Sequence, residues 1–207
     1  KWSYQIGVRA ETVNVDSEAY KKELISNEDL TIPFENNYFE LYPSAFITYS
    51  PSEKNSYQLN YSRRIDRPGI GQVNPLPEWN TPLISQFGNQ ELQPQFTNSI
   101  ESNYTRQLEK GSITAGVFFR IIEDEIQQAV LIDRDDPNRL ILTHLNFDNT
   151  TAYGVELSSS YKPTKWWSIN ASFDLFSQKQ KSIAESFDDN QNIVLNAIEV
   201  NNIAYNY

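Results

Sequence analysis

The chain has 207 residues and a net charge of −10, with 39% hydrophobic and 13% aromatic residues. This length suits one domain with a sizeable buried surface. We expect no nucleic-acid partner, because an acidic chain lacks the basic surface that neutralises phosphates. The sequence contains no cysteine, which excludes disulfide bonds and thiolate metal sites.

No run of about 18 apolar residues occurs, so no transmembrane helix is expected. A transmembrane β-strand needs only about 9 to 11 residues, and every second one meets lipid. The mean hydropathy of −0.58 is therefore compatible with a membrane barrel. No secretory signal opens the chain, which already alternates like the middle of a strand. We expect a fragment of a longer protein.

Eight segments alternate apolar and polar residues with the period of two that is typical of half-buried strands. The first is the clearest, because Trp2, Tyr4 and Ile6 alternate with Ser3 and Gln5, and the last alternates poorly. The predicted strands are residues 2–11, 39–49, 57–66, 99–107, 113–121, 153–161, 167–175 and 193–207. The predicted fold class is all-β, an antiparallel up-and-down meander of about eight strands.

Two residues interrupt this pattern. Pro43 cannot donate a backbone hydrogen bond, so it predicts a bulge or a local break in pairing. Arg63 falls in an apolar register, and a charge on a lipid face is tolerated mainly near an interface, so it predicts a strand end.

Connections of two lengths separate the predicted strands. Residues 50–56, 108–111 and 162–165 are short, whereas residues 12–37, 67–98 and 123–150 are long, and the two kinds alternate strictly. Outer-membrane barrels have this asymmetry, with short periplasmic turns and long extracellular loops. The connections therefore favour a segment of a transmembrane barrel over another kind of sheet.

Aromatic residues cluster at the predicted strand ends, as in the girdle that marks a membrane interface. The clusters are Tyr161, Trp166 and Trp167 around one short turn, and Tyr38, Tyr42 and Tyr49 along the second strand. Ordinary cross-strand packing explains any one of these residues equally well.

Several motifs occur in a fixed order along the chain. They are YSRRIDRP at residues 61–68, NPL at 74–76, GNQELQPQ at 88–95, LNF at 145–147, YGVEL at 153–157 and WWSI at 166–169. The set resembles the YSRRxxRP…NP…GNPxLxPE run and the strands that follow it in TonB-dependent receptor barrels common in Bacteroidetes. The resemblance covers residues 38–176. Gln90 replaces the usual proline and Gln95 the usual glutamate, which leaves the details of that loop open.

This resemblance implies a bacterial outer-membrane receptor with about 22 strands around a plug. Residues 1–207 would then be a single partial barrel domain, without the plug. The implied partners are membrane lipid, the plug of the full-length protein, a TonB-type energy-coupling complex, and an imported nutrient such as a siderophore, glycan or peptide. No cofactor is implied.

Candidate catalytic or metal-binding groups are few. His144 is the single histidine, which we interpret as a loop residue. Asp133, Asp135, Asp136 and Asn138 lack the spacing of an EF-hand, so a solvated acidic loop is favoured and Ca²⁺ binding stays open. Residues 123–125 are acidic, but neighbours on an extended chain point to opposite faces. We expect no enzyme activity, no catalytic residue and no bound metal.

Ligand binding is predicted for two groups of residues. Arg64, Asp66 and Arg67 would line the lumen and contact a plug or a ligand, although a ladder of ion pairs within the barrel explains them too. Trp79 and Phe87 lie in a long, proline-rich connection, and such loops commonly carry recognition on a rigid scaffold. Packing of that loop over the barrel mouth is the alternative for this pair.

A second hypothesis is a soluble extracellular β-sandwich or adhesion module that binds carbohydrate through Trp79, Trp166 and Trp167. The two hypotheses differ in the surroundings of the apolar face. A sandwich covers that face with a second sheet, whereas a barrel leaves it exposed to lipid.

Overall fold

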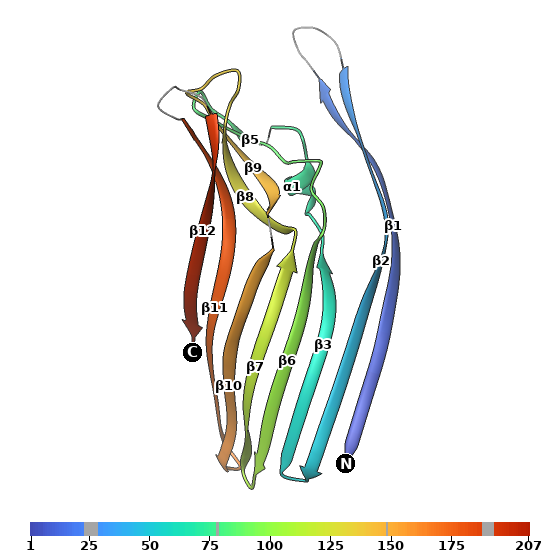
Figure 1. Cartoon of the computed structure of the whole chain (residues 1–207), viewed down its shortest axis with the longest axis vertical. Helices are drawn as coiled ribbons and strands as arrows, with labels where there is room; N and C mark the ends of the chain where they lie inside the picture. Colours follow the sequence, from blue (N-terminus) through green and yellow to red (C-terminus); the bar gives the residue numbers. More distant parts are fainter. Residues whose placement is uncertain (23–28, 78, 148, 188–192) are drawn as a thin grey trace.

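The structure is a computed structural model that describes residues 1–22, 29–77, 79–147, 149–187 and 193–207. The eight long strands are β1 (Trp2–Lys22), β2 (Asp29–Ser52), β3 (Asn55–Asp66), β6 (Gln95–Leu108), β7 (Gly111–Glu123), β10 (Thr150–Thr164), β11 (Trp167–Phe187) and β12 (Ile193–Asn206). They form one antiparallel sheet in the order β1-β2-β3-β6-β7-β10-β11-β12, which confirms the predicted meander (Figure 1). All eight predicted strands are present.

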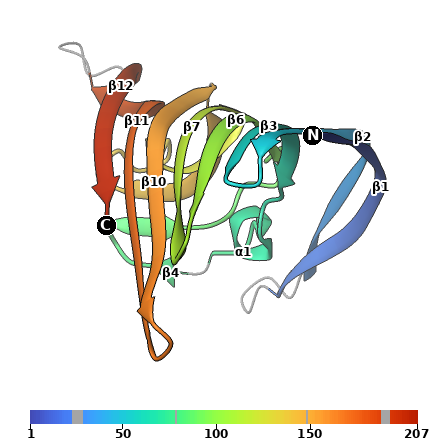
Figure 2. The same cartoon turned by 90° about the horizontal axis from the view of Figure 1, so that it is seen from below.

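A smaller sheet and a short helix lie at the end of the molecule that carries the long connections. The small sheet contains β4 (Trp79–Asn80), β5 (Ile84–Gln86), β9 (Leu140–Phe147) and β8 (Glu125–Ile132), and the helix is α1 (Ile70–Val73). Seen along the strands, the large sheet is an arc with the small sheet and α1 on its concave side (Figure 2). No helix within the described ranges is long or apolar enough to cross a bilayer.

The convex face of the large sheet is apolar from one edge to the other. Directly paired residues share a face, and one row of partners comprises Tyr4, Ile47, Leu59, Ser102, Val117, Val155, Leu175 and Tyr205. The hydrophobic members of this row are 40 to 81% exposed. The small sheet lies on the opposite face, so the sandwich hypothesis, which needs a covering sheet here, is wrong.

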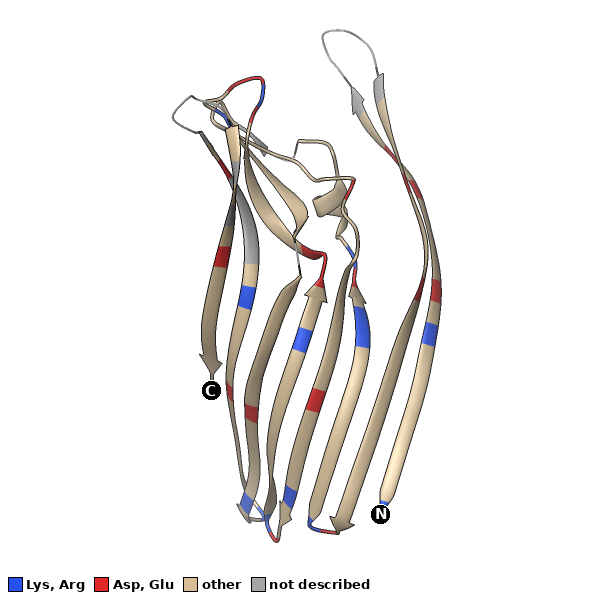
Figure 3. Cartoon of the chain, viewed as in Figure 1, with Lys and Arg blue, Asp and Glu red and all other residues tan. Residues whose placement is uncertain are grey.

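The concave face is polar. Arg120 lies on it between two carboxylates, with its Nη2 atom 3.2 Å from Glu101 Oε1 and 3.7 Å from Glu156 Oε1. The same guanidinium lies over the Phe118 ring, 4.1 Å from the ring centroid. Charged residues are otherwise sparse along the middle of the strands (Figure 3). The sheet therefore presents lipid-compatible and water-compatible faces on opposite sides.

The predicted alternation of short and long connections is confirmed, because the three short turns gather at one end of the sheet (Figure 1). The long connections, however, contain regular structure. Most of residues 12–37 is strand, since β1 runs to Lys22 and β2 begins at Asp29. Residues 67–98 contain α1, β4 and β5, and residues 123–150 contain the β8–β9 hairpin.

Pro43 marks a change in pairing. The β1–β2 register passes this residue without a shift, whereas the β2–β3 pairing ends at Ser44 and Ser62, next to it. The predicted break therefore affects only the side of β2 that faces β3. Beyond this point the β1–β2 hairpin continues as a separate two-stranded arm (Figure 1).

An aromatic row crosses four strands near the short turns. Trp2 stacks on Tyr49 with ring centroids 4.4 Å apart, Tyr49 lies 6.3 Å from Tyr57, and Tyr57 lies 4.9 Å from Tyr104. Tyr161, Trp166 and Trp167 are also exposed at this end. These rings suit a membrane interface. Tyr38 and Tyr42 do not belong to the girdle, because their even positions on β2 turn them to the concave face, where Tyr42 is buried.

Candidate ligand-binding site

The ordered sequence motifs build the segment that folds over the concave face. The N–H of Gly88 donates to Asn74 O at 2.7 Å, and the N–H of Asn89 donates to Gln72 O at 2.7 Å. A Cβ atom on Gly88 would come within 2.6 Å of both Asn74 N and Gln72 O. Glycine is required here because the two backbone segments approach so closely. The motifs at residues 74–76 and 88–95 therefore form one structural unit with α1.

Asn146, from the LNF motif, ties this unit to the small sheet. Its Nδ2 donates to Gln93 O at 2.9 Å and to Asp124 O at 2.8 Å, while its Oδ1 accepts from the Gln93 N–H at 2.8 Å. Asn89 Nδ2 donates to His144 O at 3.1 Å. The side chains of these two asparagines thus form hydrogen bonds with backbone groups of Gln93, Asp124 and His144, which gives those groups the partners that backbone N–H and C=O groups require.

The best-buried residues of the chain lie under these loops. Leu92 is 1% exposed and Thr150 is fully buried, and Ala129, Ile132 and Phe147 are buried with them. Burial of a large apolar side chain contributes about 1.5 to 3 kcal/mol. The long-connection end therefore has its own core, whereas the rest of the large sheet relies on lipid to cover its convex face.

Two buried carboxylates join the small sheet to the barrel strands. Glu125 accepts hydrogen bonds from Thr150 Oγ1, from Gln127 Nε2 at 2.7 Å and from Gln180 Nε2 at 3.3 Å. Its partners come from β8, β10 and β11, so it links three strands. These three hydrogen bonds from neutral donors explain how a carboxylate is accommodated there.

Glu185 is the second of these carboxylates, and its side chain is 4% exposed. It accepts from the Ile132 N–H at 2.8 Å, from Arg134 Nη1 at 3.0 Å and from Arg134 Nη2 at 2.5 Å. Hydrogen bonding to Arg134 holds the pKa of Glu185 below its usual value. The end of β8 is therefore fastened to the extension of β11 by a charged, bidentate contact.

Two arginines bridge the region where β2 and β3 have separated. Arg67 Nε donates to Tyr38 Oη at 2.7 Å and its Nη2 donates to Glu11. These hydrogen bonds, that to Tyr38 first, raise the pKa of Arg67. Arg63 lies 3.6 Å from Glu40 and over the ring of Phe96, 4.5 Å from the centroid. Arg67 is therefore engaged in contacts within the chain, including an ion pair with Glu11, as the alternative to ligand binding expected.

The other predicted ligand residues are not brought together. Arg64 and Asp66 are exposed on the concave face, and within the described ranges neither side chain has a hydrogen-bond or ion-pair partner. Phe87 is half-buried, and its N–H donates to Leu142 O at 3.2 Å. Trp79 pairs with Gln86 in the small sheet, and its side chain lies outside what the structure describes. Phe87 and Trp79 thus belong to the small sheet rather than to a free loop.

A hollow that the sequence did not predict lies between the β1–β2 arm and α1. Its volume is about 310 Å³, and its apolar lining includes Val13, Val15, Phe34, Ile70 and Leu92. Arg67 closes one side of it. A period-two pattern could not have placed these residues together, because the two halves of the lining are far apart in the sequence. This groove is the candidate ligand-binding site.

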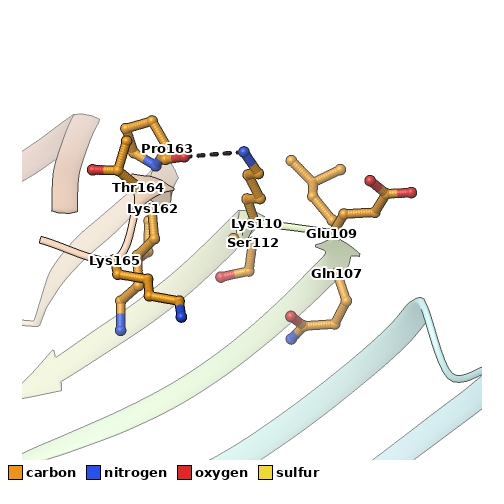
Figure 4. Close-up of a pocket in the computed structure, with 11 residues that line it drawn as sticks. Gln107, Glu109, Lys110, Ser112, Lys162, Pro163, Thr164 and Lys165 are labelled. Atoms are coloured by element: carbon orange, nitrogen blue, oxygen red, sulfur yellow. Dashed lines mark hydrogen bonds between the residues drawn. The ribbon is translucent and has the colours of Figure 1, made fainter. Parts of the chain in front are cut away.

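A larger hollow, of about 680 Å³, lies at the opposite end of the molecule, between the β6–β7 and β10–β11 turns. Figure 4 shows its lining, in which Lys110 Nζ donates to Pro163 O at 3.0 Å. Lys162 and Lys165 are exposed there. This hollow lies between short turns at the periplasmic end, so it is not a candidate site for an extracellular ligand.

His144 lies in β9, paired with Gln128, so its prediction as a loop residue is wrong. It is part of a strand because residues 140–147 pair with residues 125–132 in the small sheet. In the acidic loop, Asp133 Oδ1 accepts from the Asp135 N–H and Asp136 Oδ1 from the Asn138 N–H. Among the described residues no group of three or more His, Cys, Asp or Glu side chains is placed to hold a metal ion.

The convex apolar face, the polar concave face and the unequal ends together define a transmembrane β-barrel of the bacterial outer membrane. The chain belongs to the outer membrane protein beta-barrel family, whose model matches residues 1–207. The outer membrane is therefore where this protein resides. No curated protein matches the chain in sequence.

Two solved structures share the fold at low sequence identity. The hemophore receptor HasR of Serratia marcescens, solved with its hemophore HasA and heme, is 15% identical with a TM-score of 0.61, over 89% of this chain and 32% of HasR. The siderophore receptor PirA of Pseudomonas aeruginosa is 10% identical with a TM-score of 0.54, over 97% of this chain and 42% of PirA. The chain thus spans about a third to two fifths of these receptors.

Proposed function

We propose that the chain is part of the barrel of a TonB-dependent receptor that imports a nutrient across the outer membrane. The observation that carries the proposal is the fold of the long connections. They cover the concave face with a core of their own, including Leu92 and Phe147, at the end that faces the outside of the cell. Loops held this rigidly are suited to ligand recognition.

The resemblance to TonB-dependent receptors and the names of the two similar structures support the same function. Because the chain spans only part of those receptors, we assign closure of the barrel and the plug to the rest of the full-length protein. Arg64 and Asp66 face the lumen with unpartnered charges, and we propose that they contact the plug or the passing ligand. The proposed mechanism is binding and gated passage, without covalent chemistry.

Uptake by whole cells tests this proposal. Cells that produce the full-length protein are given labelled heme, ferric siderophores, oligosaccharides or oligopeptides, with and without a protonophore. We expect one class to accumulate only in energised cells, because TonB coupling draws on the proton gradient. Double substitution R64Q/D66N should reduce that uptake, and S158K, also on the concave face, serves as the control.

Two results would contradict the receptor function. The first is equal accumulation of every ligand class by cells with and without the protein. The second is accumulation that persists unchanged after the protonophore, which would indicate a passive pore.

A further inference from the structure

The polarity of the β1–β2 hairpin inverts where it leaves the membrane. Up to Ala10 the apolar residues of β1 occupy even positions, which face outward with Trp2. Beyond Glu11 the apolar residues occupy odd positions, as in Val13 and Val15. Because the strand keeps its register, the arm turns its apolar face toward the lumen side. Beyond Thr12 and Phe39 the outward face of the arm is mostly polar.

This inward apolar face forms one wall of the groove beside α1. The hollow of about 310 Å³ adjoins a second one of about 380 Å³, and both are lined by Phe34, Ile70 and Val73. Each volume falls within the range of roughly 300 to 1,000 Å³ that is typical of ligand sites. Ile70 is 88% exposed. The groove therefore offers apolar surface that the described residues leave uncovered.

The backbone edge of β2 that borders the groove is unpaired. The Ser50 N–H donates to Lys1 O, and the Lys1 amino group donates to Ser50 O. In an antiparallel ladder such bonded pairs recur at every second residue, so even residues of β2 bond to β1. Odd residues direct their N–H and C=O groups toward β3. Since pairing with β3 ends at Ser44, the odd residues beyond it face the gap.

Two prolines delimit this free edge. Pro33 and Pro43 both occupy odd positions, where each lacks the N–H that would face the gap. Between them the edge carries the N–H and C=O groups of Glu35, Asn37, Phe39 and Leu41, and within the described residues none of these groups has a backbone partner. Prolines commonly blunt exposed strand edges. Here they leave one short slot open.

The outer surface of the arm is acidic. Asp16 lies directly opposite Glu35 on the neighbouring strand, and Glu18 faces outward beside them. Like charges in directly opposed positions are unfavourable, and a cationic side chain placed next to them would relieve the repulsion. Cationic groups on the outward side therefore complement this surface.

We propose that an extended peptide with alternating apolar and basic side chains binds as an added strand along β2, between Pro33 and Pro43. It would continue the β2–β3 interface upward, with β2 supplying the backbone hydrogen bonds. Its apolar side chains would enter the groove between Phe34 and Ile70, and a basic side chain would lie beside Glu35, with Asp16 one strand further away on β1. This inference rests on the proposed receptor function and names the ligand class.

The test uses the full-length protein in detergent and a fluorescein-labelled peptide of alternating lysine and valine, about nine residues long to span the slot. Fluorescence anisotropy gives the affinity. N37P removes an N–H at the centre of the free edge, and the ring also obstructs pairing. We expect it to weaken binding about tenfold or more. T31P, also at an odd position of β2 but beyond Pro33, is the matched control and should bind normally.

I70D is a second variant. Ile70 lies on α1, so this substitution places a charge in the groove and leaves the strand edge of β2 unchanged. It should also weaken binding, so the test holds even if N37P fails to fold. A peptide of the same composition with lysines and valines in two blocks should bind at least about tenfold more weakly, since it lacks the period of two.

Equal affinity of N37P and T31P, or of the alternating and block peptides, would overturn the peptide slot. Absence of peptide binding would do so as well. Energised uptake of another ligand class in the cell assay would then leave the receptor function standing, so the two failures are distinguishable.

Discussion

Arg67 fastens the β1–β2 arm where the strand ladder no longer does. Its guanidinium contacts Tyr38 on β2 and Glu11 on β1, while Arg64, three residues earlier, has no side-chain partner among the described residues. We predict that R67Q loosens the arm by about 1 kcal/mol, the range of a partly exposed ion pair with added hydrogen bonds. Hydrogen exchange of the backbone amides of the even-numbered residues from 34 to 42, which pair with β1, should accelerate about fivefold, since RT is about 0.59 kcal/mol.

R64Q is the matched control for this prediction, because it removes the same charge from the same strand end. Its exchange rates should equal those of the unmodified protein. Equal acceleration in both variants would mean that the charge alone, rather than the contact with Tyr38 and Glu11, holds the arm.

The contact of Glu185 with Ile132 and Arg134, at the end of β8, depends on pH. Its pKa is lowered from the usual 4.5, mainly by hydrogen bonding to Arg134. Because the folded-state pKa is lowered, the ionised carboxylate contributes its full stabilisation of the contact above pH 4.5. This stabilisation is lost as the pH falls through the lowered pKa. We predict that a spin label on D135C gains mobility as the pH falls below 4.5. The chain has no other cysteine.

The variant E185Q isolates this carboxylate from its neighbours. In that background the spin label should already be mobile at neutral pH and should lose the acid transition. A transition that persists unchanged in E185Q would contradict the assignment of the pH dependence to Glu185.

At the scale of the strand, the two faces should respond oppositely to charge. Val155 lies in the apolar row of the convex face, and Ser158, on the same strand, lies on the concave face. We predict that V155K destabilises the barrel in lipid vesicles by about 2 to 4 kcal/mol, the cost of a lysine near the bilayer midplane. S158K should change the free energy of unfolding by less than about 1 kcal/mol. Urea titration measures both.

Strand prediction succeeded wherever one face met lipid and the other met water. It stopped early on β1 because the apolar residues change face between Ala10 and Val13, which looks like the loss of a pattern although the strand continues. It missed β8 and β9 because residues 129–132 and 140–142 are continuous apolar runs rather than alternating ones. A search for a period of two detects alternating strands and misses strands with continuous apolar runs.

The candidate site was predicted only in part. The motifs indicated Arg67 and the loop around Gly88, but their roles depend on partners far along the chain. Arg67 contacts Glu11, and Asn89 contacts His144. The groove itself is formed by Phe34 and Ile70, which no local pattern connects. Contacts between such distant residues depend on the register of the sheet, and the register cannot be predicted from any single segment of the sequence.

For the whole molecule, the structure explains how an acidic chain of low mean hydropathy resides in a membrane. Lipid covers the convex face, and the concave face carries polar and charged side chains, some of which are paired, as at Arg120. Much of the interior core, including Leu92, Ala129, Ile132 and Phe147, lies at the end where the motifs fold the long connections. Lipid covers the apolar face of the strands, and the buried residues under the long connections hold the candidate site in place.

The central claim is that the convex face of the large sheet meets lipid. Cysteine scanning of residues 152–161 in β10 tests it most directly, because the chain contains no native cysteine. Spin labels on the full-length protein in vesicles are probed with oxygen, which partitions into lipid, and with a water-soluble nickel chelate. We predict that odd positions such as 155 and 157 are accessible to oxygen, and even positions to the chelate. Chelate accessibility at the odd positions, or no alternation, would contradict the claim.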